Sequence, residues 1–461
     1  MLNLNDYKNI HCIGIGGVGL SAVAHILLAR GHHVTGSDMK ESELTDHLIE
    51  QGARIFLGHR AKNVEGADLV VYSSAVSMDN PEMAMAAELG IPMEPRAEIL
   101  GVLMEQYREG IAISGTHGKT TTTSMIAMIL TNAEKDPTIL VGGNLREIGG
   151  NVRVGSGDYF VTEACEYMDS FLHLRPRTEI ILNIESDHLD YFKDIEHIVS
   201  SFRSFTQNVP PGGRILAYDG NPFVKAAIEG ADNIITFGFS DGSVYHVSEI
   251  AFNSEGMPGF NVCKKGEKLC HIQLNIPGEH NIINALAAFA CCYEEGVDKA
   301  VIARTLSEYN GTQRRFDVKG ITKANVKIVD DYAHHPTEIK ATLSAAVNIP
   351  HKRLWCIFQP HTYTRTLALF DQFADAFERA DVVVLADIYA AREPDVYNIS
   401  SGMVADEIRR KYPTKGVYYF PTFDEIADFV MENTSDGDVV MTMGAGDIYK
   451  VGELILEKDW E

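Results

Sequence analysis

Short apolar runs alternate with longer amphipathic stretches along this chain. NIHCIGIGG, for example, is rich in branched apolar residues and leads into SAVAHILLAR, where apolar positions recur three or four residues apart. Runs of the first kind predict buried strands and stretches of the second kind predict helices. Because parallel neighbours need a long crossover, usually a helix, strands that alternate with helices predict mainly parallel sheets. The fold class expected is therefore α/β.

The pattern falls into three blocks, and a chain of 461 residues has the length of roughly three domains. Residues 1–108 contain NIHCIGIGG, HHVTGSD and ADLVVYSSA. Residues 109–317 open with GIAISG, continue through YFVTEA, EIILNIE, GRILAY and NIITFGF, and close near GTQRRFDVKG. Residues 318–461 contain KIVDDYA, RLWCIFQ, DVVVLADIY and DVVMTMGAG. We expect three domains with these boundaries.

Composition narrows the range of partners. The net charge of −24 disfavours sequence-independent binding to nucleic acid, which needs a basic surface. No apolar stretch approaches the ~18 residues of a membrane span, and MLNLNDYKNIHCIG indicates a strand rather than a signal peptide. The seven cysteines show neither a disulfide framework nor zinc spacing, which favours reduced thiols. We expect a cytoplasmic protein with no nucleic-acid or membrane partner.

The glycine-containing stretch ISGTHGKTTTT has the pattern of a phosphate loop. A strand, a glycine turn and a helix start aim backbone N–H groups and the positive end of a helix dipole at an anion. Lys119 is expected to reach the β- and γ-phosphates of ATP, and the Thr120 hydroxyl to bind Mg²⁺. Ile113 stands where the strict pattern has glycine, so an ordinary turn is the alternative. The residues expected at ATP here are Gly115, Thr116, Gly118, Lys119, Thr120 and Thr121.

The first block carries another glycine signal, Gly14, Gly16, Gly17 and Gly19, between a predicted strand and a predicted helix. The spacing fits a dinucleotide-binding turn, and Asp38 after the next strand would bind a ribose hydroxyl of NAD. Taken alone, this pattern predicts an NAD-dependent dehydrogenase. The same geometry also holds other diphosphates, including a nucleotide sugar, and two phosphate sites in one chain suggest two different nucleotides.

Acidic and imidazole side chains follow two strands of the second block. Glu163 and Glu166 follow YFVT, and Asp187 and His188 follow EIILNIE. Open α/β sheets bind ligands at the carboxyl ends of their strands. Oxygen ligands with an occasional imidazole suit Mg²⁺ near phosphate. Each residue alone could be a solvated carboxylate or a hydrogen-bonded histidine, but their shared block with the phosphate loop favours a magnesium site.

Six motifs in order along the chain resemble those of the Mur ligases of bacterial peptidoglycan synthesis. They are GIGGVGLSAVA with VTGSD, ISGTHGKTTTT, EACEYMDSFLHLRP with NIESDHLDYF, PGEHNIINALAA, GTQRRFD, and DDYAHHPTE with FQPHTYTRT. The resemblance implies an N-terminal Rossmann-like domain for a UDP-sugar, a central phosphate-loop ATPase-like domain and a C-terminal Rossmann-like domain for the amino acid.

The resemblance also implies a reaction, ATP-dependent joining of L-alanine to the carboxylate of UDP-N-acetylmuramate. A carboxylate has a poor leaving group, and transfer of the γ-phosphoryl group converts it to an acyl phosphate that the amine then attacks. A related ligase attaches a tripeptide to the same sugar acid, and GIGGVG is more similar to the alanine-adding branch. A non-catalytic nucleotide sensor is a third alternative, which the cluster of Glu166, Asp187 and His188 disfavours.

Site residues carried over from the resemblance extend to all three blocks. One departure is Thr362, where members of the family often have arginine, so Arg365 is expected to carry more of the contact with a carboxylate. The cofactors implied are ATP and Mg²⁺, for which Mn²⁺ can substitute, in a monomer or weak homodimer. The residues implied are Gly14, Gly16, Gly17, Gly19, Ser37, Asp38 and Ser74 at the UDP-sugar, Asn281 and Asn284 at adenine, Arg315 at phosphate, Asp331 at ribose, Tyr332, His334, His361 and Arg365 at the alanine and the sugar acid, Thr120, Glu166 and His188 at the metal, and Lys119, Glu166, His188 and Arg365 in catalysis.

Overall fold

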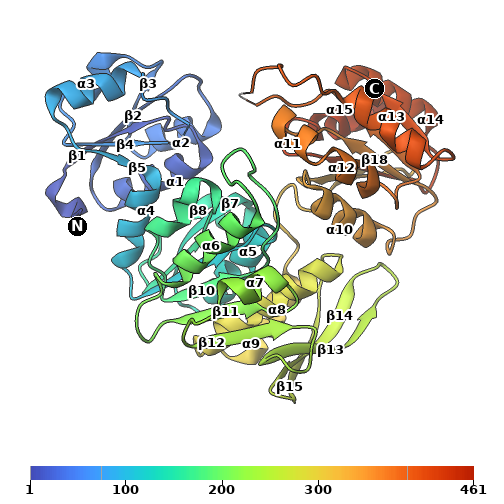
Figure 1. The fold of residues 1–461 in the computed structure, drawn as a ribbon, viewed down its shortest axis with the longest axis horizontal. Coiled ribbons are helices and arrows are strands. Elements are labelled where there is room, and N and C mark those ends of the chain that lie inside the picture. The colour runs from blue at the N-terminus through green and yellow to red at the C-terminus, as the bar shows by residue number, and fades with distance from the viewer. Residues whose placement is uncertain (1, 74, 392, 461) are drawn as a thin grey trace. The chain divides into compact units, whose positions relative to one another are not determined.

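The structure, a computed structural model, describes residues 2–73, 75–391 and 393–460 (Figure 1). Three β-sheets and their covering helices make up the chain. None of the helices in these ranges is both long and apolar enough to cross a bilayer. The chain forms two compact units, of which unit 1 comprises Met1–Gly115, Ile126–Ile184 and Val199–Ile235, and unit 2 comprises Thr116–Met125, Glu185–Ile198 and Thr236–Glu461.

The first sheet lies in unit 1 and has five parallel strands in the order β3-β2-β1-β4-β5. Cys12 at its centre pairs with Gly36 on one side and Val71 on the other. The predicted parallel sheet of this block is confirmed. Its elements are η1 Leu4–Asp6, β1 Asn9–Ile13, α1 Val18–Ala29, β2 His33–Asp38, α2 Glu43–Glu50, β3 Arg54–Leu57, η2 Ala61–Val64, β4 Leu69–Tyr72, α3 Pro81–Leu89, β5 Met93–Pro95 and α4 Arg96–Glu105.

The second sheet has ten strands in the order β15-β14-β13-β12-β11-β10-β6-β9-β7-β8. In unit 1 its strands β11, β10, β6, β9 and β7 are parallel, and β8 is antiparallel. The elements up to this point are β6 Glu109–Ser114, α5 Lys119–Asn132, β7 Thr138–Leu145, η3 Arg146–Ile148, β8 Gly150–Arg153, β9 Tyr159–Glu163, η4 Tyr167–His173, β10 Thr178–Ile181, α6 Ile195–Thr206, β11 Arg214–Tyr218, α7 Pro222–Ala227 and β12 Ile234–Gly238.

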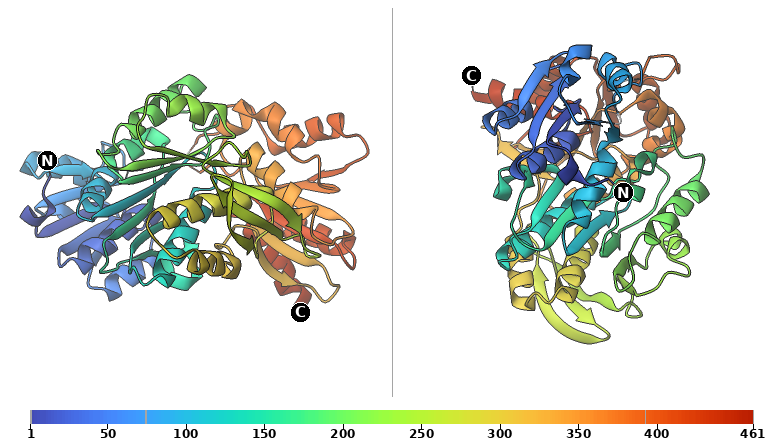
Figure 2. Two further views of the ribbon diagram at one scale, coloured as in Figure 1. Left: turned by 90° about the horizontal axis from the view of Figure 1, so that it is seen from below. Right: turned by 90° about the vertical axis from the view of Figure 1, so that its left-hand side faces the viewer.

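Three further strands of this sheet, β13 to β15, are not predicted by the apolar pattern; β13 is parallel to β12, and β14 and β15 are each antiparallel to the strand before them (Figure 2). The second half of β13 and most of β15 are not buried, whereas β14 is buried but includes Pro258, Gly259 and Asn261, so none of the three strands has the long apolar run that marks the other strands. Helices α8 and α9 follow them. The elements are β13 Tyr245–Phe252, β14 Pro258–Lys264, β15 Glu267–Gln273, α8 Glu279–Glu294 and α9 Lys299–Glu308.

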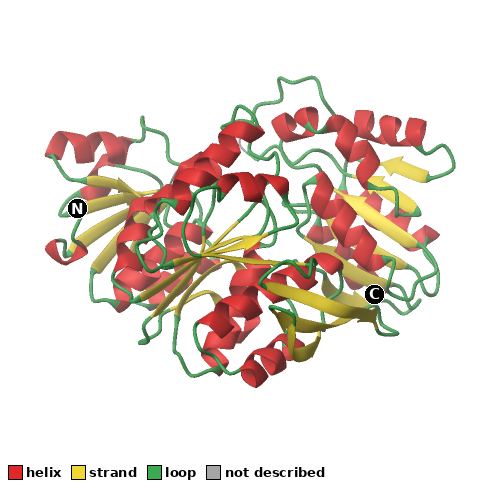
Figure 3. Ribbon diagram, turned by 60° about the horizontal axis from the view of Figure 1, so that its bottom comes forward, coloured by secondary structure: helices red, strands yellow, loops and turns green. Residues whose placement is uncertain are grey.

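The third sheet, also in unit 2, has the order β16-β17-β21-β18-β19-β20, with β16 antiparallel and the others parallel. Alternate residues of β18 enter two cores, with Cys356 among those facing α10, α12 and α13 and Trp355 among those facing α14 and α15. Helices therefore cover both faces (Figure 3). The elements are β16 Asp317–Ile321, β17 Lys327–Asp331, α10 Pro336–Ala346, β18 Leu354–Phe358, α11 Tyr363–Ala368, α12 Phe370–Ala376, β19 Val382–Leu385, α13 Ser401–Lys411, β20 Gly416–Tyr419, α14 Phe423–Asn433, β21 Val439–Met443 and α15 Tyr449–Trp460.

A buried carboxyl group lies in the middle of the second sheet. Glu179 of β10 is fully buried, at the position that pairs with Ala112 of β6 and Ile215 of β11. Neither of its side-chain oxygens has a hydrogen-bond partner in the part of the chain that the structure describes. Burial raises the pKa of Glu179 well above its ordinary value, so the folded protein keeps this carboxyl protonated.

Replacing Glu179 by methionine should stabilise the protein at pH 5 by about 1–3 kcal/mol, because it removes an unsatisfied buried polar group, and should stabilise it further at pH 8. At low pH the carboxyl is protonated in both states. As pH rises past the ordinary pKa, the unfolded chain ionises while the folded chain does not, so the wild type loses about 1.4 kcal/mol per pH unit up to the folded pKa. Urea unfolding at pH 5 and pH 8 measures the difference, with the exposed Glu88→Met as control. An equal gain at both pH values would contradict the prediction.

Candidate active site

A glycine-rich turn joins β1 to α1 in unit 1. Gly14 has a φ of 81°, which glycine adopts without strain. Asp38, at the end of β2, accepts a hydrogen bond from the N–H of Gly16 at 2.9 Å, and a Cβ atom at Gly16 would lie 2.9 Å from the same oxygen. The turn itself therefore needs its glycines, and Asp38, which the sequence assigns to a ribose, also holds the turn in place.

Of the two serines assigned to the UDP-sugar by resemblance, Ser37 is described by the structure. Ser37 is fully buried and its hydroxyl donates to Glu82 Oε2 at 2.5 Å, with His59 Nδ1 3.0 Å away. The hydroxyl is part of an internal network, and its role at the UDP-sugar stays a prediction. Ser74 lies outside the described residues.

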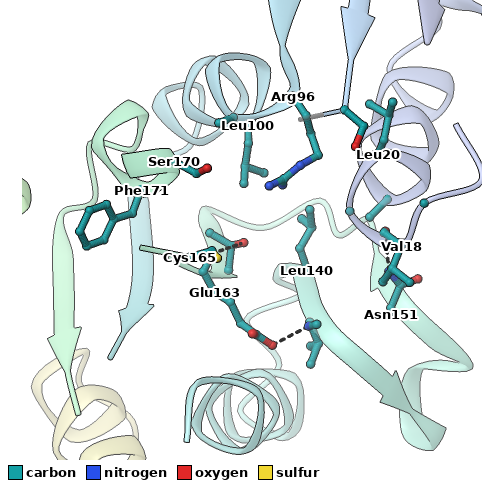
Figure 4. Close-up of a pocket in the computed structure, with 18 of the residues that line it drawn as sticks. Val18, Leu20, Arg96, Leu100, Leu140, Asn151, Glu163, Cys165, Ser170 and Phe171 are labelled. Atoms are coloured by element: carbon teal, nitrogen blue, oxygen red, sulfur yellow. Dashed lines mark hydrogen bonds between the residues drawn. The ribbon is translucent and has the colours of Figure 1, made fainter. Parts of the chain in front are cut away.

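A pocket of about 370 Å³ opens beside the glycine turn (Figure 4). It lies within unit 1, between the starts of α1 and α4 and the strands β7 and β9. Two predicted UDP-sugar residues, Gly17 and Gly19, therefore share one cavity with the predicted acidic residue Glu163. The lining includes Gly17, Gly19, Ser73, Arg96, Asn151 and Glu163.

Arg96 is the residue of this pocket that the motifs do not reveal. It begins α4 and its side chain extends into the pocket (Figure 4), packed so closely on Gly19 that a Cβ atom there would lie 3.2 Å from Nε. Burial lowers its pKa, which the nearby Cys165 partly offsets. The side chain of Arg96 makes no hydrogen bond or salt bridge within residues 2–73, 75–391 and 393–460. A cation at the start of a helix is unfavourable, so a partner anion from a ligand would explain its position.

The acidic residues after β9 lie at the carboxyl end of that strand, as predicted. Glu163 accepts a hydrogen bond from the N–H of Gly142 at 2.5 Å (Figure 4), and a Cβ atom at Gly142 would lie 2.8 Å from both carboxylate oxygens. Glu166 is buried immediately before η4. The structure thus gives Glu163 a backbone partner, and the metal-binding role of Glu166 stays a prediction.

The phosphate loop precedes α5, which begins at Lys119. Lys119 Nζ donates to the carbonyl oxygen of Thr116 at 3.2 Å, and the Thr116 hydroxyl accepts from the N–H of Glu185 at 2.9 Å. Gly118 has a φ of 86°, and Gly115 before it a φ of 131°. The strand, turn and helix predicted here are present, with Lys119 at the helix start.

The four threonines of this helix start divide into two pairs. Thr120 and Thr121 retain a little exposure, whereas Thr122 and Thr123 are fully buried. The hydroxyls of Thr122 and Thr123 have no hydrogen-bond partner in the described chain. Only the first pair is therefore placed at the surface of the loop, where the predicted contacts with phosphate and metal would occur.

A buried ion pair joins Asp187 to Arg365, which are far apart in the sequence. Nε and Nη2 of Arg365 both donate to Asp187 Oδ1, at 3.2 and 3.0 Å, and the N–H of His188 donates to the same oxygen at 2.8 Å. Burial opposes ionisation of Asp187, but Arg365 and then His188 hold its pKa well below the ordinary value. The arginine predicted to hold a substrate carboxylate is therefore already oriented by one carboxylate of the chain.

The residues predicted at the amino acid form one continuous group. Nη1 of Arg365 lies 3.2 Å from His361 Nδ1, the His361 ring contacts that of His334, and His334 contacts Tyr332. Burial is the main cause that lowers the pKa of His334 to about 3 and that of His361 to about 4. Both imidazoles are neutral, which leaves Arg365 as the cation of this group.

Thr362, the departure from the usual arginine, has a structural role. It is the N-cap of α11 and its hydroxyl accepts from the N–H of Arg365 at 3.4 Å. Its φ of 64° is uncommon for a β-branched residue. Thr362 therefore helps to set the short helix that carries Arg365.

The residues assigned to adenosine have partners within the chain. Asn281 Nδ2 donates to the carbonyl oxygen of Pro277 at 2.7 Å, and Asn284 Nδ2 donates to Asn281 Oδ1 at 3.0 Å. Asp331 accepts from two backbone N–H groups, and burial raises its pKa to about 6. Arg315 lies over the ring of Tyr332. These contacts fix the four side chains, and their roles at adenine, ribose and phosphate stay predictions.

A phosphate loop at a helix start, a glycine turn beside an arginine-lined pocket and a further α/β domain define a multidomain nucleotide-dependent ligase. The chain belongs to the Mur ligase family, a family of ATP-dependent enzymes. Its family models match residues 9–108 (Mur ligase family, catalytic domain), 113–292 (Mur ligase middle domain) and 314–446 (Mur ligase, glutamate ligase domain). The predicted family and α/β fold class are confirmed.

Similar proteins support the same family. The UDP-N-acetylmuramate--L-alanine ligase of Caldanaerobacter subterraneus subsp. tengcongensis is 50% identical over 99% of both chains. The crystal structure of the UDP-N-acetylmuramate-alanine ligase of Thermotoga maritima is 30% identical, with a TM-score of 0.82, over 98% of this chain and 99% of that one. A UDP-N-acetylmuramate:L-alanyl-gamma-D-glutamyl-meso-diaminopimelate ligase structure, from Neisseria meningitides, is 28% identical, with a TM-score of 0.62, over 67% of this chain and 99% of that one.

Proposed function

We propose that this enzyme joins L-alanine to the carboxylate of UDP-N-acetylmuramate, with ATP as the energy source, in the synthesis of peptidoglycan precursors. The observation that carries the proposal is the 50% identity, over nearly the full length of both chains, to a ligase of that name. The tripeptide-adding relative is less similar in identity and in TM-score, and a dehydrogenase would leave the phosphate loop at Lys119 without a role.

The reaction begins with phosphoryl transfer to the sugar carboxylate, which this chain assists by positioning and charge. Lys119 is placed to neutralise charge on the β- and γ-phosphates. Thr120 and His188 provide an oxygen and a nitrogen donor that suit Mg²⁺ or Mn²⁺, and the buried Glu166 is a further predicted ligand. The metal ion supplies positive charge at the phosphate oxygens when bound.

In the second step the amine of alanine attacks the acyl phosphate and phosphate leaves. Arg365 retains N–H groups beyond those that contact Asp187 and His361, and a guanidinium fits a carboxylate. We infer that these groups bind the alanine carboxylate, while the neutral His334 and His361 form the wall of the site. Asp187 acts through Arg365 by fixing its orientation.

Phosphate release from ATP tests the function directly. The assay contains Mg²⁺ and UDP-N-acetylmuramate and compares L-alanine, glycine, L-serine, the tripeptide and no amine. Release that depends on L-alanine and on the sugar nucleotide supports the proposal. Release with the tripeptide alone would assign the chain to the recycling reaction, and none under any condition would leave a nucleotide-binding protein.

Arg96 is expected to bind an anionic group of the sugar nucleotide. Arg96→Ala should raise KM for UDP-N-acetylmuramate about 10- to 100-fold, because a hydrogen bond to a charged group contributes about 1.5–3 kcal/mol. The KM for ATP should stay unchanged. Steady-state kinetics test both values, and Arg108→Ala, at a side chain 77% exposed, is the control. An unchanged KM for the sugar nucleotide would refute the assignment.

The remaining expectations concern the setting of the enzyme. We infer that the enzyme is cytoplasmic, because its substrates are nucleotides and an amino acid. A monomer or weak homodimer is the oligomeric state that the family resemblance implies. The net charge of −24 supports the absence of a nucleic-acid partner. The three-domain division at residues 108 and 317 also stays part of the proposal.

A further inference from the structure

His117, in the phosphate loop, lies between two carboxylates from distant parts of unit 2. Its Nδ1 is 3.2 Å from Glu338 Oε1 in the first turn of α10, and its Nε2 is 3.5 Å from Glu185 Oε2 after β10. The side chains of His117 and Glu338 are only 14% and 12% exposed. The sequence patterns that predict the phosphate loop and the acidic residues at the strand ends do not assign His117 a role.

The segments that carry the two carboxylates are also linked to each other. The Thr337 hydroxyl donates to Glu185 Oε2 at 2.7 Å, and His335 Nε2 lies 3.3 Å from the carbonyl oxygen of Ser186. Glu338 also accepts from the N–H groups of His334 and His335 as part of the capping box of α10. The start of α10 is thus tied both to the phosphate loop and to the segment that carries Asp187 and His188.

The occupant of this cluster is a proton rather than a metal ion. Burial alone would lower the pKa of His117, but Glu338 and Glu185 raise it to about 9, so the ring is a cation with a carboxylate at each nitrogen. His117, Glu185 and His335 do bring ligand atoms within 4.8 Å of one another. However, His335 Nδ1 accepts from the N–H of Thr337, so its proton is on Nε2, which then has no lone pair for a metal.

We propose that His117 is a positioning residue that couples the phosphate loop to the start of α10. Held between Glu185 and Glu338, it fixes the loop that presents Lys119 relative to the segment that carries Tyr332 and His334. The phosphate loop and the residues predicted at the amino acid are thereby held in a fixed relative position. The inference rests on the proposed ligase function and adds a residue on which the alignment of its two substrates depends.

The test uses His117→Gln, Glu338→Gln and the double variant of the full-length enzyme. Glutamine at residue 338 keeps the acceptor of the capping box but removes the charge. Each single variant should lower kcat for alanine ligation on the order of 10- to 100-fold, because a small displacement of the reacting groups has an effect of this size. Equilibrium binding of ATP should change by less than about threefold, because Lys119 is retained. His117→Lys, which keeps a cation, should recover part of kcat.

A double variant no worse than the poorer single variant supports the coupling, because both substitutions then remove one interaction. Glu425→Gln is the matched control, since Glu425 has the same capping role in α14 away from the loop. Losses that multiply in the double variant, or ATP binding that weakens in proportion to kcat, would overturn the proposal. So would Zn²⁺ binding that depends on His117 and His335. Absence of ligation in the wild type would instead refute the proposed function.

Discussion

Lys119→Ala should reduce ATP-dependent ligation on the order of 10³-fold or more, with UDP-N-acetylmuramate binding unchanged. The γ-phosphoryl group carries negative charge throughout its transfer, and a positioned cation stabilises that charge most strongly where water is excluded. Lys119 begins α5, and its ammonium group is held by the carbonyl oxygen of Thr116 at 3.2 Å. Single-turnover phosphate release with saturating substrates measures the chemical step.

Two controls separate this effect from loss of fold. Lys193→Ala removes an exposed lysine, and its activity should stay within about twofold of the wild type. Thermal unfolding of Lys119→Ala should stay close to that of the wild type, because water can hydrogen-bond the carbonyl oxygen of Thr116 once the ammonium group is removed. Ligation within tenfold of the wild type would show that the loop does not bind the transferred phosphate.

The sequence predicts the elements that have a local signature. The buried parallel strands β1, β6, β10 and β18 stand out as apolar runs, and the glycine turns before α1 and α5 follow from backbone requirements that glycine meets. The strands β13 to β15 are not predicted, because β13 and β15 are largely unburied and the buried β14 is interrupted by Gly259 and Asn261, so none has a continuous apolar run. β8, a short antiparallel strand beside β7, has no apolar run either.

The site is predicted where a motif marks it and missed where side chains meet only in space. His117 and Glu338 are 221 residues apart, and nothing in either segment indicates the other. Ser37 is assigned to the UDP-sugar by resemblance, and its hydrogen bond to the buried Glu82 could not be predicted from the sequence. Arg96 is visible in hindsight as a cation at a helix start, where the dipole disfavours it.

Burial and neighbouring carboxylates set the charges of the side chains predicted at the amino acid and beside the phosphate loop. Burial keeps His334 and His361 neutral, with pKa values of about 3 and 4, while the carboxylates around His117 keep it cationic. Near neutral pH the amino-acid group therefore contains one guanidinium, Arg365, balanced by Asp187. A substrate carboxylate that enters this group can contact Arg365, and Arg314 and Arg315 lie beside it over the ring of Tyr332.

Arg365→Ala should therefore lose both activity and stability. Asp187, buried and ionised, would be left without its main counter-charge, and removal of one partner from such a pair typically costs about 3–5 kcal/mol. Loss of the predicted contact with the alanine carboxylate should lower kcat/KM for L-alanine on the order of 100-fold. Urea unfolding and steady-state kinetics measure the two effects separately.

The double variant Arg365→Ala with Asp187→Asn distinguishes the two causes. Asparagine at residue 187 carries no charge, so most of the stability lost in Arg365→Ala should return. Activity should not return, because the guanidinium that meets the substrate is still missing. Arg365→Lys is the matched charge-preserving variant, and its single ammonium cannot contact Asp187, His361 and a carboxylate together. If the double variant recovered kcat/KM, Arg365 would serve only to neutralise Asp187, and the alanine carboxylate would have to be bound elsewhere.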